Sequence, residues 1–198
     1  MCILDHHQFD SKRIALIGNS ARILEGTDGP RIDAHDLVIR FNLAWPDLAK
    51  RPSGIGTRTT HMMVGGREFK TPDKARKFDR IRAQHREVIF FSAKGDPRKW
   101  TLPKAPVPLM PDETYDELVA QMDGFTPTSG AAMLYYLVAY CSVRALSLYG
   151  FDGLQSKVWY KTQAHPFAKC HSPEAESRFL ARMDQQPHVN VWPCPPER

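Results

Sequence analysis

A small set of mostly polar residues, with two glycines and one phenylalanine, has the composition expected of a site for a phosphate-bearing ligand. Its members are Asn19, Ser20, Asn42, Thr128, Ser129, Gly130, Gly150 and Phe151, followed along the chain by His171 and Glu176. Amides, hydroxyls and glycine N–H groups are neutral hydrogen-bond donors suited to a phosphate. A histidine can take up a proton near neutral pH, so His171 could act as a general base. Taken alone, a histidine beside a helix start is more often a surface residue.

The stretch 13–42 must position the first of these side chains. Apolar runs at 14–17 and 37–41 predict two strands, and Asn19 and Asn42 follow their carboxyl ends. Open α/β sheets bind ligands at that edge, and a helix starting after Gly18 would offer N–H groups to a phosphate. The stretch lacks both the G-x-G-x-x-G dinucleotide fingerprint and the P-loop pattern. A nucleotide site and a buried strand with an ordinary helix cap therefore both fit the local pattern.

The rest of the chain alternates between strand and helix patterns. Further strands are predicted at 57–64, 87–91, 143–148 and 188–192, and helices at 72–86, 112–122, 131–141 and from 173 onward. Glycine and proline at 26–30, 51–56 and 97–111 predict turns and loops. The alternation predicts a largely parallel sheet. Ser172 and Pro173 are typical of a helix start, which would hold His171 just outside a helix N-terminus.

Composition narrows the class of protein. A chain of 198 residues, 42% hydrophobic and 25% charged, fits a single domain over 1–198 with frayed ends at 1–12 and 193–198. The net charge of +5 favours anionic partners, and the basic helix at 72–86 fits either a solvated face or contact with an anionic membrane. No apolar run is long enough to span a membrane, and no signal-peptide pattern precedes the first strand.

The cysteines indicate the redox environment in which the protein is expected to function. Cys2, Cys141, Cys170 and Cys194 match no zinc-site spacing and predict free thiols in a reducing environment. The expected location is the cytoplasm, or the inner face of the membrane as a peripheral protein. Nucleic acid is not an expected partner, because the chain has neither an RNP-like aromatic motif nor a helix-turn-helix pattern.

Three motifs, taken in order, resemble those of glycosyltransferase family 29, the animal-type sialyltransferases. The words IGNS, GPRIDAHDLVIRFN and GTRTTH between Arg13 and Val64 resemble the long sialylmotif. PTSGAAMLYYLVAY and LSLYGF resemble the short sialylmotif, and residues 171–176 fit the very-short motif H-x-x-x-x-E. The last motif alone carries no weight, but all three keep the family's order and rough spacing from residue 13 to 180. The chain looks like a short homologue of bacterial type.

The resemblance implies a fold and a reaction. The fold would be a Rossmann-like α/β/α sandwich with a mostly parallel central sheet, a GT-A-like variant. The reaction would transfer sialic acid from CMP-sialic acid to a hydroxyl of a glycan or glycolipid acceptor, with inversion and without a metal or other cofactor. The acceptor could lie at an anionic membrane surface.

The resemblance also implies roles for individual residues. Asn19 and Asn42 would hold the ribose and phosphate of CMP, and Ser20 would lie near the phosphate or the sugar. Further donor contacts would come from Thr128, Ser129, Gly130, Gly150 and Phe151. His171 would be the general base on the acceptor hydroxyl, with Glu176 in support. A phosphate monoester leaving group needs stabilisation by hydrogen-bond donors or cations rather than protonation.

The chain departs from the family pattern in three places. The family joins its long and short motifs by a disulfide, and the two cysteine positions are here Ile14 and Val143, so packing is expected to replace the bridge. The histidine of the third motif has no firm counterpart in 159–165, where Tyr160, Lys161 or His165 could contact the phosphate. The chain is also shorter than typical catalytic domains of the family, so the acceptor does not follow from the resemblance.

Other functions remain open on the sequence. A transferase for another CMP-activated ulosonic acid, such as Kdo, would need a similar pocket. A catalytically inactive domain that binds CMP or glycans would fit the degraded third motif.

Overall fold

The computed structural model describes residues 2–42, 52–65, 87–91, 108–109, 111–159 and 170–192. The basic helix predicted at 72–86, most of the loop at 97–111, the candidates Tyr160, Lys161 and His165, and the tail 193–198 lie outside these residues.

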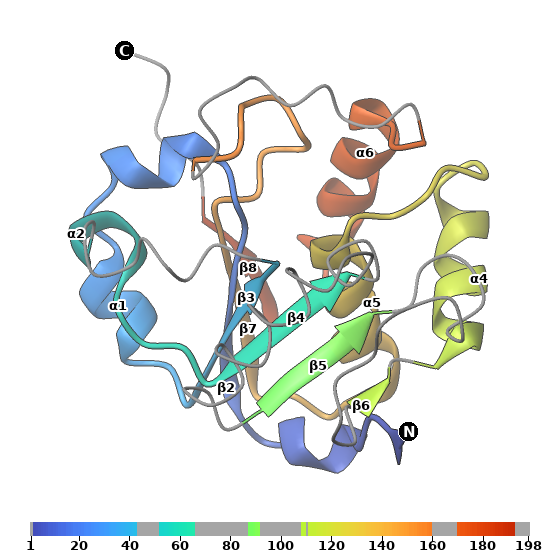
Figure 1. The fold of residues 1–198 in the computed structure, drawn as a ribbon, viewed down its shortest axis with the longest axis horizontal. Helices are drawn as coiled ribbons and strands as arrows, with labels where there is room; N and C mark the ends of the chain where they lie inside the picture. The colour runs from blue at the N-terminus through green and yellow to red at the C-terminus, as the bar shows by residue number, and fades with distance from the viewer. Residues whose placement is uncertain are drawn as a thin grey trace, which may run out of the picture.

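A single parallel sheet forms the centre of the described structure (Figure 1). Its strands are β1 (Cys2–Ile3), β2 (Arg13–Ile17), β3 (Leu37–Phe41), β4 (His61–Gly65), β5 (Glu87–Phe91), β6 (Pro108–Leu109), β7 (Ala145–Tyr149) and β8 (Val189–Val191). They lie in the order β1-β6-β5-β4-β3-β2-β7-β8, and every neighbouring pair is parallel. The prediction of a mostly parallel sheet is therefore confirmed.

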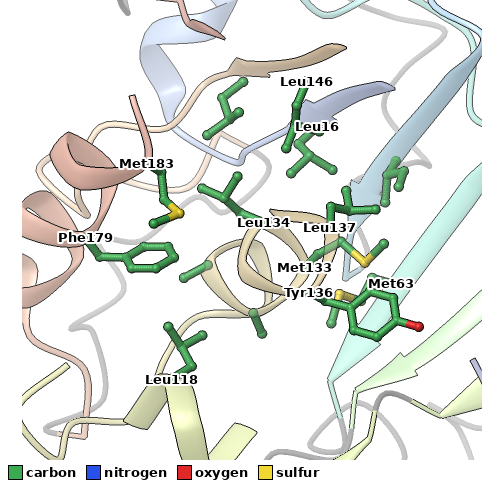
Figure 2. Close-up of a cluster of buried hydrophobic side chains, with 14 of the residues drawn as sticks. Leu16, Met63, Leu118, Met133, Leu134, Tyr136, Leu137, Leu146, Phe179 and Met183 are labelled. Carbon is green, nitrogen blue, oxygen red and sulfur yellow. The ribbon is translucent and has the colours of Figure 1, made fainter. Parts of the chain in front are cut away.

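Helices cover both faces of the sheet. On one face lie α4 (Asp112–Gln121), α5 (Ser129–Tyr140) and α6 (Pro173–Met183); the other carries the short helices η2 (Ala21–Glu25), α1 (Gly29–Asp33) and α2 (Pro52–Ile55). The larger hydrophobic cluster joins α5 to the sheet through residues such as Leu16, Met133 and Leu146 (Figure 2). A smaller cluster on the other face includes Ala15 and Ile32. The chain therefore forms an α/β/α sandwich.

Two helices that approach the site begin with side-chain caps. The Thr128 hydroxyl oxygen accepts a hydrogen bond from Ala131 N at the start of α5, 3.1 Å away. The Ser172 hydroxyl oxygen does the same for Ala175 N at the start of α6, at 3.2 Å, as the sequence predicts. Helix α5 is apolar nearly all round and buried, whereas α6 buries one face only. A side-chain hydrogen bond therefore fixes the backbone in the first turn of each of these helices.

The structure corrects three expectations. The segment 2–12 is not frayed, because Leu4 and Phe9 are buried and η1 (His6–Phe9) packs against α5. Residues 29–33 and 52–55 form the helices α1 and α2 where glycine and proline predict turns and a loop. Residues 57–60 precede β4 instead of belonging to it.

Packing takes the place of the family's disulfide. Ile14 is fully buried in the larger cluster, and Val143 packs against the same cluster. The free thiols predicted for Cys141 and Cys170 are confirmed. Among the residues with a described position, no helix combines the length and apolarity needed to cross a bilayer.

Candidate functional site

The chain changes direction across the sheet at β2, and the site lies at that point. From β2 the strands β3 to β6 run outward on one side, and the chain then returns to place β7 and β8 on the other side. Such a reversal opens a crevice outside the carboxyl ends of the strands. Two turns meet there: Gly18 N donates to Tyr149 O at 2.7 Å, and Ser20 N donates to Gly150 O at 3.2 Å.

Close backbone approach explains the glycines of these turns. A Cβ on Gly18 would lie 2.2 Å from the carbonyl oxygen of Gly150, which no real side chain tolerates. Gly150 itself has a φ of 70°, in the left-handed region that favours glycine. The turns after β2 and β7 are thus locked together by backbone contacts, and sequence analysis identified only Gly150 as a site residue.

Phe151 forms the floor between the turns and helix α5. Its ring meets Phe41 edge to face, with ring centroids 6.1 Å apart. A Cβ on Gly130 would lie 2.7 Å from its Cε1 atom, and one on Gly18 would lie 3.0 Å from its Cδ2 atom. The side chain is only partly buried. Gly130 is therefore required by the ring of Phe151, whatever contact its N–H makes with a ligand.

Asn19 and Asn42 stand at the ends of adjacent strands, as predicted. Asn19 Nδ2 donates to Phe41 O at 3.4 Å, whereas the buried Oδ1 atom of Asn19 accepts no hydrogen bond from the described chain. Asn42 has a φ of 60°, which non-glycine residues rarely adopt, and its Oδ1 accepts from Gly65 N at 3.3 Å. One amide acceptor is therefore unsatisfied, and the other residue carries backbone strain.

The N-terminus of α5 faces the ends of β3 and β4. A Cβ on Gly65 would lie 3.6 Å from Ser129 Oγ and 3.7 Å from Asn42 Oδ1, so these side chains flank the same glycine. The first N–H groups of α5, which begins at Ser129, lack partners within the helix and can bind a phosphate. Gly65 is a functional candidate that the sequence analysis missed.

Ser20 is held by the loop that follows β7. The hydroxyl oxygens of Ser20 and Ser156 lie 2.8 Å apart, and Ser20 Oγ also accepts from Arg22 N at 3.2 Å. Ser156 N in turn donates to Asp152 Oδ2 at 3.0 Å. Ser20 is buried, and its hydroxyl is oriented by these hydrogen bonds.

His171 is oriented by a backbone carbonyl. Its Nδ1 atom lies 2.7 Å from Thr126 O, and because a carbonyl can only accept, Nδ1 carries the proton. In a neutral imidazole the lone pair is then on Nε2. Thr126 N also donates to Cys170 O at 2.8 Å, so two hydrogen bonds join the segment before α5 to the segment before α6. Backbone contacts like these of Thr126 have no signature in sequence.

Glu176 makes a third link between the same segments. Its Oε1 atom accepts from Thr128 N at 2.8 Å, and the residue is only 4% exposed. Burial raises the pKa of this carboxyl from 4.5 to about 6, although hydrogen bonds from Thr128 oppose the shift. Glu176, the predicted support residue, is therefore hydrogen-bonded to Thr128, the N-cap of α5. His171, the predicted base, is hydrogen-bonded to Thr126 in the same segment.

Curated relatives and solved structures resemble this chain. CMP-N-acetylneuraminate-beta-galactosamide-alpha-2,3-sialyltransferase 1 of Homo sapiens is 37% identical over 68 residues, 34% of this chain and 19% of the human protein. The Mus musculus protein of the same name is 39% identical over 59 residues, 30% of this chain and 17% of that protein. The chain matches less than a fifth of the length of these relatives.

The fold is similar to that of solved sialyltransferases. A mammalian sialyltransferase in complex with Gal-beta-1-3GalNAc-ortho-nitrophenol has a TM-score of 0.62 at 20% identity, covering 92% of this chain and 69% of that one. CstII from Campylobacter jejuni, in complex with the substrate analogue CMP-3FNeuAc, has a TM-score of 0.59 at 16% identity, covering 91% and 80%. At these identities the likeness concerns the fold.

The family follows from a longer match. The model of glycosyltransferase family 29 (sialyltransferase) matches residues 4–105, more than half of the 198 residues, including the turn after β2 and both asparagines of the crevice. This chain belongs to glycosyltransferase family 29.

Proposed function

We propose that this protein is an inverting glycosyltransferase that moves sialic acid from CMP-sialic acid to a hydroxyl of a glycan or glycolipid acceptor without a metal ion. Membership of the family supports the donor class. The observation that carries the proposal is that His171 and the N-terminus of α5 are bound to the same piece of backbone, Thr126 to Thr128. A candidate base and a candidate phosphate site are thereby held at a fixed separation.

The donor would occupy the crevice at the carboxyl edge. The unsatisfied Oδ1 of Asn19 would accept a hydrogen bond from a ribose hydroxyl, which would remove the cost of leaving that atom buried without a partner. Asn42 would contact the ribose or phosphate from the end of β3, and Ser129 and Gly130 would give N–H groups to the phosphate. Phe151 would lie against the cytidine.

The transfer would be a single displacement. The acceptor oxygen forms a bond to the anomeric carbon while the bond from that carbon to the phosphate oxygen breaks, and CMP leaves with the bonding electrons. The hydroxyl proton passes to Nε2 of His171. Nδ1 donates to Thr126 O before and after this transfer, so the ring keeps its orientation while it becomes cationic.

The chemistry of the proposed donor supports metal independence. A CMP-sugar carries one phosphate, and neutral donors at a helix N-terminus can stabilise its charge. A metal-dependent enzyme of this general class would present paired carboxylates at a strand end. Asp152 is the carboxylate that follows β7. It is not part of an Asp-x-Asp pair, and its Oδ2 atom accepts a hydrogen bond from Ser156 N at 3.0 Å. The α/β/α sandwich is compatible with a GT-A-like variant.

A transfer assay tests the proposal. Release of CMP from CMP-sialic acid is measured with and without a panel of glycan acceptors, in excess EDTA and with added Mn²⁺, and CMP-Kdo serves as the alternative donor. We expect turnover of CMP-sialic acid that is insensitive to EDTA and to Mn²⁺. If only CMP-Kdo is turned over, the donor is the Kdo nucleotide and not CMP-sialic acid. Loss of turnover on chelation, with recovery on addition of Mn²⁺, would refute the metal-free mechanism.

A further inference from the structure

Two large apolar side chains are exposed in the part of the chain that the structure describes, and they differ in what holds them at the surface. Phe125 and Tyr140 are both 40% exposed. The Tyr140 hydroxyl donates to Glu117 Oε2, which gives that side chain a polar reason to remain at the surface. Phe125 has no polar atom in its side chain, so its exposure has no such cause.

The backbone around Phe125 is fixed on both sides. Two consecutive left-handed residues follow α4 and its C-cap Met122: Asp123 with a φ of 54° and Gly124 with a φ of 82°. Phe125 N then donates to Met122 O at 2.9 Å, and the next residue, Thr126, is bound to Cys170 and His171. A rigid backbone with a large apolar side chain left in solvent is a feature of a preformed contact surface, because little conformational entropy is lost on binding.

Phe125 also precedes, in the chain, the residue that orients the candidate base. Its neighbour Thr126 supplies the carbonyl that orients His171, and consecutive Cα atoms are about 3.8 Å apart. In Figure 1 the chain between α4 and α5 runs past the carboxyl ends of β4 and β5. An acceptor whose hydroxyl reaches His171 would therefore lie close to the backbone segment that carries Phe125.

We propose that Phe125 is the aromatic platform on which the acceptor sugar lies. The inference rests on the proposed function and adds to it a residue that selects the acceptor. The face of an aromatic ring carries partial negative charge and attracts the C–H groups on the apolar face of a pyranose. Contact with the ring also removes apolar surface of both partners from water. The ring would align a neutral hexopyranose with its hydroxyl toward Nε2 of His171.

Three variants test the platform against a matched control. Phe125→Ala removes the ring, and Phe125→Trp keeps an aromatic face. Tyr140→Ala truncates a side chain of equal exposure at the C-terminal end of α5, a helix about 18 Å long that begins four residues after Phe125. Acceptor KM is measured with Gal-beta-1-3GalNAc-ortho-nitrophenol and with a panel of neutral glycans. CMP affinity by calorimetry and hydrolysis of CMP-sialic acid without acceptor report on the donor site alone.

We expect Phe125→Ala to raise acceptor KM about tenfold while CMP affinity and donor hydrolysis stay within about twofold. Phe125→Trp should keep acceptor KM within about threefold, and Tyr140→Ala should leave it unchanged. Equal losses in the alanine and tryptophan variants, an unchanged KM in Phe125→Ala, or a parallel loss of CMP affinity would each overturn the platform. Binding of CMP with no glycan accepted would also overturn it while sparing the donor site, whereas failure of CMP binding would refute the proposed function itself.

Discussion

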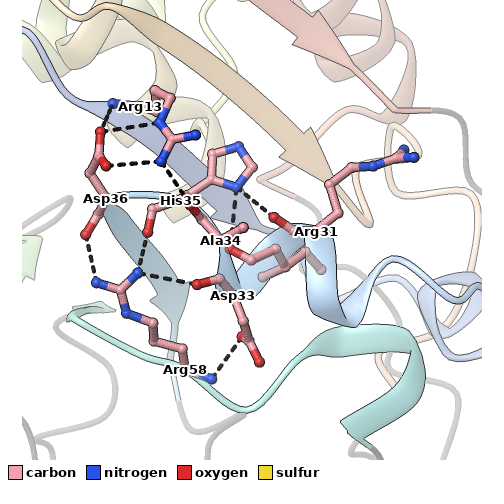
Figure 3. Close-up of polar contacts among 8 residues, drawn as sticks. Arg13, Arg31, Asp33, Ala34, His35, Asp36 and Arg58 are labelled. Atoms are coloured by element: carbon pink, nitrogen blue, oxygen red, sulfur yellow. Dashed lines mark hydrogen bonds and ion pairs between the residues drawn. The ribbon is translucent and has the colours of Figure 1, made fainter.

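The polar groups at the two edges of the parallel sheet differ in how fully they are hydrogen-bonded. At the amino edge, where β2 and β3 begin, charged side chains and carbonyls form a closed network (Figure 3). At the carboxyl edge, where the same strands end, an amide oxygen is unsatisfied and an asparagine adopts a left-handed backbone. Unsatisfied polar groups and backbone strain tend to persist at functional sites. These two features of the carboxyl edge support the proposal that the donor binds there.

Two arginines, Arg13 and Arg58, donate the hydrogen bonds that hold the amino edge together. Arg13 donates to the Asp36 carboxylate from its backbone at 2.8 Å and from its guanidinium at 3.1 Å. These contacts lower the pKa of Asp36 to about 2. Arg58 donates to the carbonyls of Asp33 at 3.2 Å, Asp36 at 2.8 Å and His35, which closes the C-terminal end of α1. These hydrogen bonds stabilise the fold locally.

The largest effect is expected for His171→Ala at the carboxyl edge. Loss of a general base should lower the transfer rate by roughly 10²-fold or more, while CMP affinity stays nearly unchanged. Steady-state transfer and calorimetry with CMP measure the two quantities. Turnover close to that of the wild type would remove His171 from the mechanism and leave the base unidentified.

Asn19→Ala and Asn42→Ala should each weaken CMP binding by about 1–3 kcal/mol, because a polar ligand group would be buried without its partner. Asn42→Gly is the matched control for backbone strain, since it relaxes the φ of 60° and removes the same amide. Titration calorimetry should give similar CMP affinities for the alanine and glycine variants at position 42. Full affinity in both Asn19→Ala and Asn42→Ala would contradict the assignment of the donor crevice.

Glu176→Gln should change how stability depends on pH. The pKa of Glu176 is raised from 4.5 to about 6 in the folded protein, so the folded state holds this proton more tightly than the unfolded chain. Its contribution to stability is complete below pH 4.5 and is lost as the pH rises through about 6. Glutamine keeps an oxygen for Thr128 N and does not titrate.

Urea denaturation between pH 4.5 and 7.5 measures this effect, because that range brackets the shifted pKa. The difference in unfolding free energy between the variant and the wild type should shift by roughly 2 kcal/mol in favour of glutamine as the pH rises. Glu176→Ala, which loses the acceptor, should be less stable than glutamine throughout. Parallel pH profiles for wild type and glutamine would show that the carboxyl titrates normally.

The smallest effect is expected at the amino edge. Asp36→Asn weakens the contact with Arg13, but the pair is exposed and screened by water, so the loss of stability should stay below about 1 kcal/mol at neutral pH. The wild-type contribution is present above the normal pKa of 3.8 and is lost as the pH falls toward 2. CMP affinity should not change, and a clear loss would mean that the two edges are coupled.

The sequence predicts those parts of the fold whose signal is local. Strands β3 and β5 have the predicted bounds, since each is a short run in which four of the five residues are apolar. The start of α6 follows from Ser172 and Pro173. The asparagines at the strand ends follow from the strands themselves. The pattern of strand, turn and helix left a nucleotide site and an ordinary helix cap both open, and the resemblance to the sialylmotifs favoured the nucleotide site.

Other parts depend on tertiary contacts that leave no local signal. Helix α2 lies in a stretch read as a loop, and its end is held by Arg40, a buried cation on β3 whose guanidinium donates to Ile55 O at 2.6 Å. Burial lowers the pKa of Arg40 to about 10. Thr126 and Gly65 act through backbone atoms, so their residue types say nothing of their contacts. The order of the segment 2–12 likewise rests on packing against α5.

The position of β2 in the sheet also sets how much of the chain must be synthesised before the two turns of the candidate donor site can meet. β2 is near the start of the sequence, but one of its two sheet neighbours, β7, comes from residues 145–149. The ribosome must therefore release Gly150 before the two turns of the crevice can meet. Pairings of such long sequence separation form slowly, and until then one edge of β2 is open to aggregation. A nucleotide that binds only the completed crevice would draw the folding equilibrium toward the native state, so under the proposed function CMP added during refolding would act as a chemical chaperone.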